Sequence, residues 1–389
     1  MQLLLSILGI VLFVGLVLIH EYGHFRSARR HGVVVEEFGL GFPPRAWARR
    51  LKSGMKLSLN WLPLGGFVKL KGEHDADRQP GSFGAASLSA KTRILLAGVT
   101  ANLLAGLILL TLLALIGMPK LITNEWSGEE QFSIASDTKI VRQEVRVAAV
   151  QAGSPAAQAG LDSRDVIVSL NERPVGDTRQ LQTVAGQLAG QTIRLVYKHR
   201  DQSLNKLVTL RSAAEVKSSL RTDQPKGYLG IEPVDLEVRR HTWSAPIVAL
   251  GFTKQLAWLT LKGIGHALAG LGSTIAGLVT GNQQAREAGQ AEATAQVGGP
   301  VAIANILWGS GELGIYFVLM IIAIISLTLA LINALPVPAL DGGRLAVILG
   351  ARALKRRLNP STEDLIHGAG MAVLLALVAL ITIVDVKRF

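Results

Sequence analysis

"LLLSILGIVLFVGLVLIHEYGH", residues 3–24, joins an unbroken apolar run to a short polar cluster at its end. As a helix rising about 1.5 Å per residue, the run is long enough to cross a hydrocarbon core about 30 Å thick. Two histidines and a glutamate fit hydrocarbon poorly, and ionisable side chains in or beside an apolar span commonly mark a functional site. The stretch therefore predicts a membrane helix that ends in a functional cluster.

The composition of the whole chain also indicates a membrane protein. Of its 389 residues 49% are hydrophobic, and the mean hydropathy of +0.37 is too apolar for an average soluble protein. Four windows lack any formal charge: Gln2–Ile19, Ile94–Met118, Leu313–Leu335 and Gly368–Val384. We predict an α-helical polytopic membrane protein whose four transmembrane helices cover residues 1–25, 93–118, 312–335 and 366–385.

The net charge of +12 indicates a membrane protein rather than a nucleic-acid-binding protein, because no stacking aromatic residues interleave the basic ones. Basic residues flank the first two windows: Arg26, Arg29, Arg30, Lys91 and Arg93. By the positive-inside rule, residues 26–92 are then cytoplasmic, as is the basic loop after the third window. The basic pair at 387–388 argues mildly against this topology. The absence of cysteine excludes disulfides, thiolate zinc sites and a cysteine nucleophile.

The long stretch between the second and third windows divides by composition. Short alternating runs such as "TIRLVYKHR" (192–200) predict a strand-rich soluble domain over residues 138–236, outside the cytoplasm in the four-span topology. Residues 243–279 are apolar but carry two lysines and a histidine. This pattern favours amphipathic, membrane-associated helices and a connector over residues 241–311, although a fifth span remains the alternative.

The cytoplasmic segment contains "MKLSLNWLPLGGFVKLKGE", residues 55–73. Two alternating runs around the turn signal "PLGG" predict a β-hairpin. Its apolar content beside two spans predicts a re-entrant hairpin that dips toward the bilayer, while an ordinary surface hairpin is equally compatible with the residues.

The polar cluster has the spacing of a metal site. His20 and His24 lie four residues apart, so one helix face presents both imidazoles to one zinc ion, and Glu21 stands beside them to activate water. The pentapeptide alone could equally be a helix end that meets the lipid headgroups. A catalytic zinc usually takes a third protein ligand, and Asp341 in "NALPVPALDGGR" (333–344) follows the third apolar window.

The count of spans decides between a ligand and a turn residue for Asp341. The first and third spans both run from outside to inside, so the two motifs reach one membrane depth near the cytoplasmic face. A fifth span would put them on opposite faces of the membrane.

These motifs resemble the site-2 proteases, intramembrane zinc metalloproteases, and among them the bacterial RseP-like branch. "HEYGH", "NALPVPALDGG", "LPLGGFVKL", "GVTAN" (98–102) and "GGPVAIA" (298–304) each match a family motif. The resemblance implies one Zn2+ per chain, held by His20, His24 and Asp341, with Glu21 as the catalytic base. It also implies substrate-binding residues: Asn333, Asn102 and the edge strand Gly66, Phe67, Val68 and Lys69.

The soluble domain resembles a PDZ module with a circularly permuted order. "GSPAAQAGLDSRDVIVSLNERPV" (153–175) follows the bacterial PDZ pattern, and "GYLGI" resembles its carboxylate-binding loop. The loop residues are Gly227, Tyr228, Leu229, Gly230 and Ile231. Arg164 stands where the pattern has glycine, and only one such pattern is found, whereas close relatives carry two.

The resemblance implies an enzyme of the bacterial inner membrane that cleaves the transmembrane segments of single-span proteins, such as anti-sigma factors or remnant signal peptides. The PDZ domain is expected to face outward and to filter substrates or bind C-terminal peptides. Two alternatives are a membrane metal transporter or sensor, and an inactive PDZ scaffold. A transporter or sensor would leave Glu21 without a function. The intact set of His20, Glu21, His24 and Asp341 argues against an inactive scaffold.

Overall fold

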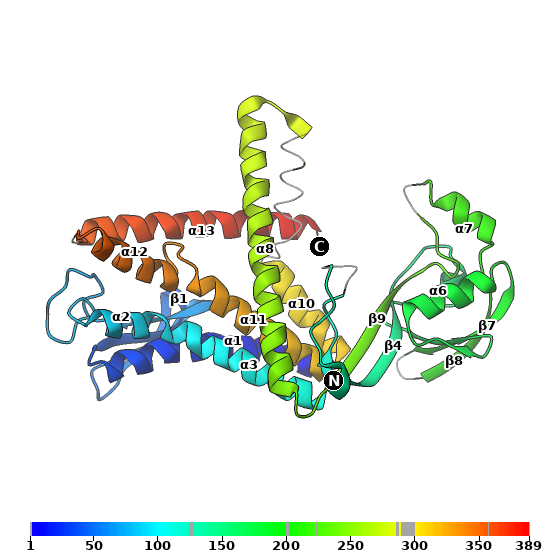
Figure 1. The fold of residues 1–389 in the computed structure, drawn as a ribbon, viewed down its shortest axis with the longest axis horizontal. Coiled ribbons are helices and arrows are strands. Elements are labelled where there is room, and N and C mark those ends of the chain that lie inside the picture. The colour runs from blue at the N-terminus through cyan, green and yellow to red at the C-terminus, as the bar shows by residue number, and fades with distance from the viewer. Residues whose placement is uncertain are drawn as a thin grey trace. The chain divides into compact units, whose positions relative to one another are not determined.

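The computed structural model describes residues 2–123, 128–199, 202–222, 225–284, 288, 300–356 and 358–388. The chain forms two compact units, one of residues 1–113 and 244–389 and the other of residues 114–243. The first contains the apolar helices and the second an antiparallel sheet (Figure 1).

Four helices of the described chain are long and apolar enough to cross a membrane. They are α1 (Gln2–Arg30), α3 (Ala97–Ile116), α11 (Ile315–Ala334) and α13 (Pro360–Arg388). Each contains one of the uncharged windows or most of it, so the helices fit the prediction of a polytopic membrane protein. Helix α1 continues past its apolar run to Arg30, so the polar cluster lies within the helix.

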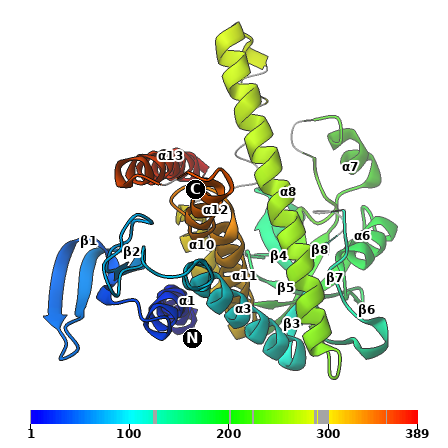
Figure 2. The same cartoon turned by 60° about the vertical axis from the view of Figure 1, so that its left-hand side comes forward.

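The other helices of this unit are α2 (Leu88–Leu95), α8 (Ala245–Thr280), α10 (Pro300–Leu313) and α12 (Asp341–Ala353). Helix α10 packs against α1 and α11, where Leu16, Leu307 and Ile322 form a buried cluster (Figure 2). The apolar stretch after residue 243 forms the single helix α8, which is not among the four candidate spans. Most of the predicted connector lies outside the described residues.

The predicted hairpin within residues 55–73 is wrong. Strand β1 (Val35–Arg50) pairs with strand β2 (Lys56–Leu70), and residues 37–40 of β1 lie between the two halves of β2. Glu37 pairs with Lys56 on one side and with Lys69 on the other. The "PLGG" segment is therefore a bend, with Gly65 at φ +98°, that carries β2 around β1. Residues 38–42, "FGLGF", also alternate, a signal that could have located the true partner.

This pairing leaves residues 66–69 at an edge. Within the described chain they form ladder pairs only with residues 37–40. The sheet rests on a buried cluster that joins it to three helices, containing Ala28 of α1, Leu70, Ile94 of α2 and Ile348 of α12. The edge is thus fixed to the same helices that carry the polar motifs.

The second unit is built on one seven-stranded sheet, in the order β3-β9-β4-β5-β7-β8 with β6 beside β5. Its elements are β3 (Met118–Pro119), η1 (Ala135–Asp137), β4 (Lys139–Val150), α5 (Pro155–Gln158), β5 (Val166–Leu170), β6 (Arg173–Pro174), α6 (Thr178–Gln187), β7 (Thr192–His199), β8 (Gln202–Thr209), α7 (Ala213–Ser219) and β9 (Ile231–Arg240). Alternate residues of β7, Ile193, Leu195 and Tyr197, enter its core. The unit extends beyond the predicted 138–236 because β3 pairs with the end of β9.

Arg164 occupies the left-handed region, with φ +83°. Glycine adopts this conformation without the steric cost that a Cβ adds. Replacing Arg164 by glycine should therefore stabilise this unit by about 0.5–1 kcal/mol. Native-state hydrogen exchange of the β5 amides should slow accordingly.

A control for this substitution is Arg194→Gly, at an exposed position of β7. There glycine adds backbone entropy to the unfolded chain and removes an exposed ion pair with Glu172, so exchange should accelerate. Equal changes in the two variants would contradict the role assigned to the backbone conformation of Arg164.

Candidate metal centre

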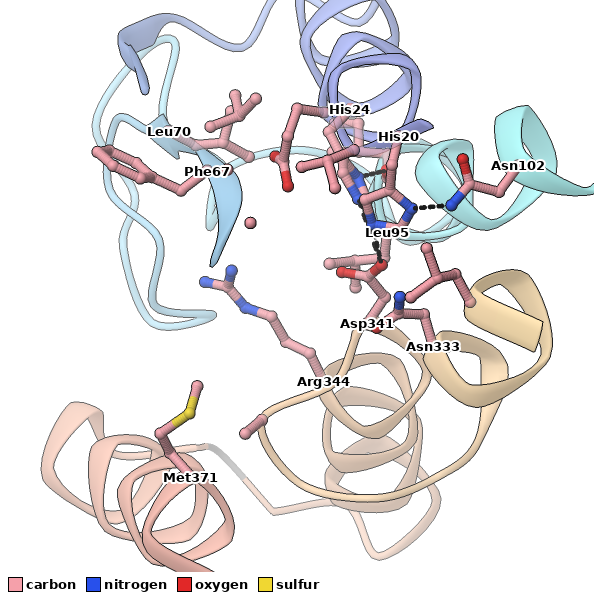
Figure 3. A pocket seen from close by; sticks show the side chains of 18 residues that line it. His20, His24, Phe67, Leu70, Leu95, Asn102, Asn333, Asp341, Arg344 and Met371 are labelled. Carbon is pink, nitrogen blue, oxygen red and sulfur yellow. Dashed lines mark hydrogen bonds and ion pairs between the residues drawn. The ribbon is translucent and has the colours of Figure 1, made fainter. Parts of the chain in front are cut away.

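His20, His24 and Asp341 converge on one point (Figure 3). Asp341 Oδ2 lies 3.2 Å from His20 Nε2 and 3.3 Å from His24 Nε2. The two Nε2 atoms are 3.1 Å apart. The side chains are 12% exposed for both histidines and 21% for Asp341. In the described chain this is the one group of three metal-ligating side chains close enough to share an ion.

The spacing of the three atoms fits zinc. Ligands about 2.0–2.1 Å from a tetrahedral zinc lie about 3.3–3.4 Å from one another, close to the three separations measured here. Asp341 Oδ2 is buried, and apart from the two Nε2 atoms, which can donate to it only when they carry a proton, it has no hydrogen-bond partner among the described residues. A buried carboxylate oxygen without a partner is costly, and a metal ion would satisfy it.

Neighbouring groups orient both imidazoles. His24 Nδ1 lies 2.8 Å from the carbonyl oxygen of Ile94, so it is the protonated nitrogen and Nε2 is left for a metal. His20 Nδ1 lies 3.4 Å from Asn102 Nδ2, while the buried Asn102 Oδ1 has no partner. Turning this amide over would let Oδ1 accept the Nδ1–H of His20, the tautomer that a metal on Nε2 requires.

Asp341 reaches the histidines because the chain turns tightly between α11 and α12. The turn brings Gly342 against the carbonyl of Ala334, and Gly343 against that of Val337, closer than a side chain would allow. Asp341 is the first residue of α12, which aims its carboxylate back toward α1. The double glycine after Asp341 thus has a packing reason.

A cavity of about 370 Å3 opens beside the three residues. Glu21 lines it next to the histidines, and Gly66, Phe67 and Val68 line it from the edge of β2. Figure 3 shows Phe67 on this side of the cavity. Asn102 and Asn333 also line the cavity, although Asn102 is only 1% exposed. Lys69 does not line this cavity, but a neighbouring one.

One residue that lines the site has no role predicted from the sequence. Arg344 lines the cavity and holds the loop after β2, where its Nη2 donates to the carbonyl oxygen of Glu73 at 2.8 Å. Its guanidinium also lies 5.1 Å from the ring centroid of Phe83. Its position three residues after Asp341, one helical turn, was the available signal.

A membrane protein with a two-histidine, one-carboxylate centre and an adjoining glutamate belongs to the class of membrane metalloenzymes. The model of peptidase family M50 matches residues 8–377. The chain therefore belongs to this family, the site-2 proteases, and is a zinc metalloprotease.

Named relatives match along almost the whole chain. A Clostridium acetobutylicum protein with the provisional name zinc metalloprotease is 26% identical over 98% of this chain and 96% of its own. The regulator of sigma-E protease, RseP, of Salmonella typhimurium is 24% identical over 96% of each chain. Among solved structures, the PDZ domain of an SdrC-like protein from Listeria monocytogenes covers 25% of this chain and 93% of its own, at 21% identity. Its TM-score of 0.21 does not establish the fold of the second unit.

Gly98 provides a test of the centre. A Cβ at this position of α3 would lie 2.7 Å from His20 Nε2 and closer still to His24 Nε2. Gly98→Ala should therefore displace both imidazoles and lower the zinc content of the purified protein at least tenfold, measured by elemental mass spectrometry.

The matched control is Gly15→Ala in α1, where a Cβ meets nothing within 4 Å. It should keep one zinc per chain, since alanine only favours the helix. Full zinc occupancy in Gly98→Ala would show that the ion is held elsewhere.

Proposed function

We propose that this protein cleaves peptide bonds within transmembrane segments of single-span membrane proteins, at a zinc ion held by His20, His24 and Asp341. The observation that carries the proposal is the shared cavity: the metal centre, Glu21 and an open strand edge line one space. A transporter is not favoured, because the described chain contains no second cluster along a path.

Chemistry at this site needs a nucleophile and a proton carrier. Bound zinc supplies Lewis acidity and lowers the pKa of water toward ~7. Glu21 directly follows His20 in α1 and lines the same cavity as both histidines. It would accept the proton of the attacking water and deliver it to the leaving amine.

The edge strand would hold the substrate in an extended form. A helix in lipid satisfies its own backbone, so unwinding it exposes donors and acceptors at a cost of several kcal/mol each, as an order of magnitude. Residues 66–69 can offset this cost by pairing with the unwound segment. Asn333 of α11 lines the cavity, and its side chain forms no hydrogen bond within the described chain, so its amide is free for the substrate.

In this proposal the enzyme lies in the bacterial inner membrane with the metal centre near the cytoplasmic face. The arginines after the first span and the basic loop after the third support that orientation. The β1–β2 sheet then dips toward the bilayer as a re-entrant element, beside the helices whose buried cluster it shares.

Replacing Glu21 by glutamine tests the enzyme proposal. Glutamine keeps the size of the side chain but cannot carry the proton, so cleavage of a single-span substrate should fall at least 10²-fold, as removal of a general base does. Zinc content should remain one per chain. His24→Ala should instead lose the ion, and undiminished cleavage by Glu21→Gln would refute the assigned role.

We propose that residues 114–243 form a PDZ domain that filters substrates outside the cytoplasm. The loop of Gly227–Ile231 leads into β9, and a cavity of about 350 Å3 lies between this loop, β9 and α6. The first half of β9 pairs only with β4 in the described chain. A peptide terminus could therefore add to β9 while the loop amides hold its carboxylate.

Excision of this unit tests the filter. Met118 and Arg239 are paired in β3 and β9, so a short Gly-Ser linker can replace residues 119–238. The excised protein should cleave a full-length substrate with a bulky ectodomain faster than the intact protein does. Both should cleave a pre-trimmed substrate at equal rates, and unchanged selectivity would contradict the filter.

A further inference from the structure

A second cavity adjoins the metal centre. It measures about 630 Å3 and shares lining residues with the first, among them Leu70, Asp341 and Arg344, so the two cavities are neighbours. It is lined by the loop after β2 and by the first turns of α13. We call it the acidic pocket, after the five carboxylates besides Asp341 that line it: Glu36, Glu73, Asp77, Glu363 and Asp364.

Three of these carboxylates have a basic partner. Glu36 pairs with Lys69 at 3.5 Å, and Glu73 with Arg344 at 3.3 Å. Asp364 lies 2.8 Å from His74. This hydrogen bond raises the pKa of His74, so the pair approaches electrical neutrality.

The other two carboxylates, Asp77 and Glu363, have no basic partner among the described residues. Within the described chain neither Asp77 nor Glu363 takes part in an ion pair. Glu363 is only 2% exposed. Its Oε2 accepts a hydrogen bond from the backbone nitrogen of Asp75 at 3.0 Å, but its Oε1 has no partner. His367 Nε2, one helical turn further along α13, is also buried without a partner.

A buried carboxylate oxygen without a donor is costly, and a cationic donor is the partner that relieves it most. We infer that the acidic pocket binds a lysine or arginine side chain from the flank of the substrate, just outside its transmembrane segment. The inference rests on the proposed function and deepens it.

The chemistry of the substrates agrees with this assignment. Single-span proteins carry their excess of lysine and arginine on the cytoplasmic flank, the side on which the metal centre is proposed to lie. A substrate that enters the first cavity along residues 66–69 would therefore bring its basic side chains to the neighbouring acidic pocket. The pocket would favour substrates in the orientation that places the cut bond at the metal.

The test uses full-length protein in detergent and two single-span substrates that differ only in three flank residues, lysine in one and glutamine in the other. The wild type should cleave the lysine substrate with a kcat/KM about tenfold higher, a preference that falls in 0.5 M salt. Asp77→Asn combined with Glu363→Gln should reduce this preference to about twofold or less, with little change for the glutamine substrate. Glutamine at 363 can still accept the Asp75 hydrogen bond.

Glu172→Gln removes one carboxylate from the second unit, where the side chain is 86% exposed, and should keep the full preference. Asp77→Asn alone should lower it partly, which provides a readout if the double variant unfolds. Equal cleavage of both substrates by the wild type, or full preference in Asp77→Asn and in the double variant, would overturn the assignment. Absence of any cleavage by the wild type would instead refute the proposed function.

Discussion

The structure depends on the approach of α1 to α3 and to the start of α12. Three ligand atoms from opposite ends of the chain must come within about 3.3–3.4 Å of one another to share a zinc ion. That approach is possible only because Gly98 presents no side chain to the imidazoles and because the double glycine closes the turn before α12. Packing density at these contacts therefore determines whether the centre exists.

The same contacts connect the centre to the strand that would hold a substrate. Residues 66–69 form the edge of a sheet whose base packs with α1, α2 and α12. Arg344 joins α12 to the loop that follows this strand. The candidate metal ligands and the strand edge are thus fixed to one set of helices, which would keep the distance from the scissile bond to the metal constant while a substrate unwinds. The acidic pocket extends this arrangement beyond the membrane segment.

Local patterns predicted the parts whose signals are local. Four uncharged windows, the spacing of His20 and His24, and the alternation in residues 192–200 each appear in the structure as helix, metal-facing pair and strand. The hairpin failed because alternation identifies a strand but not its partner. Residues 37–40 lie between the two halves of β2, and only the full set of ladder bonds shows this. No role for Arg344 was predicted from the sequence, because its partner, Glu73, belongs to a distant segment.

The sequence by itself determined the four candidate spans and the pairing of "HEYGH" with the motif around Asp341 as a candidate ligand set, because charge and hydropathy restrict where a chain can lie in a bilayer. Only the tertiary structure decided which strand edge faces the metal and which carboxylates remain without a basic partner. Both properties depend on contacts between segments far apart in the chain, and such contacts leave no periodic trace in either segment alone.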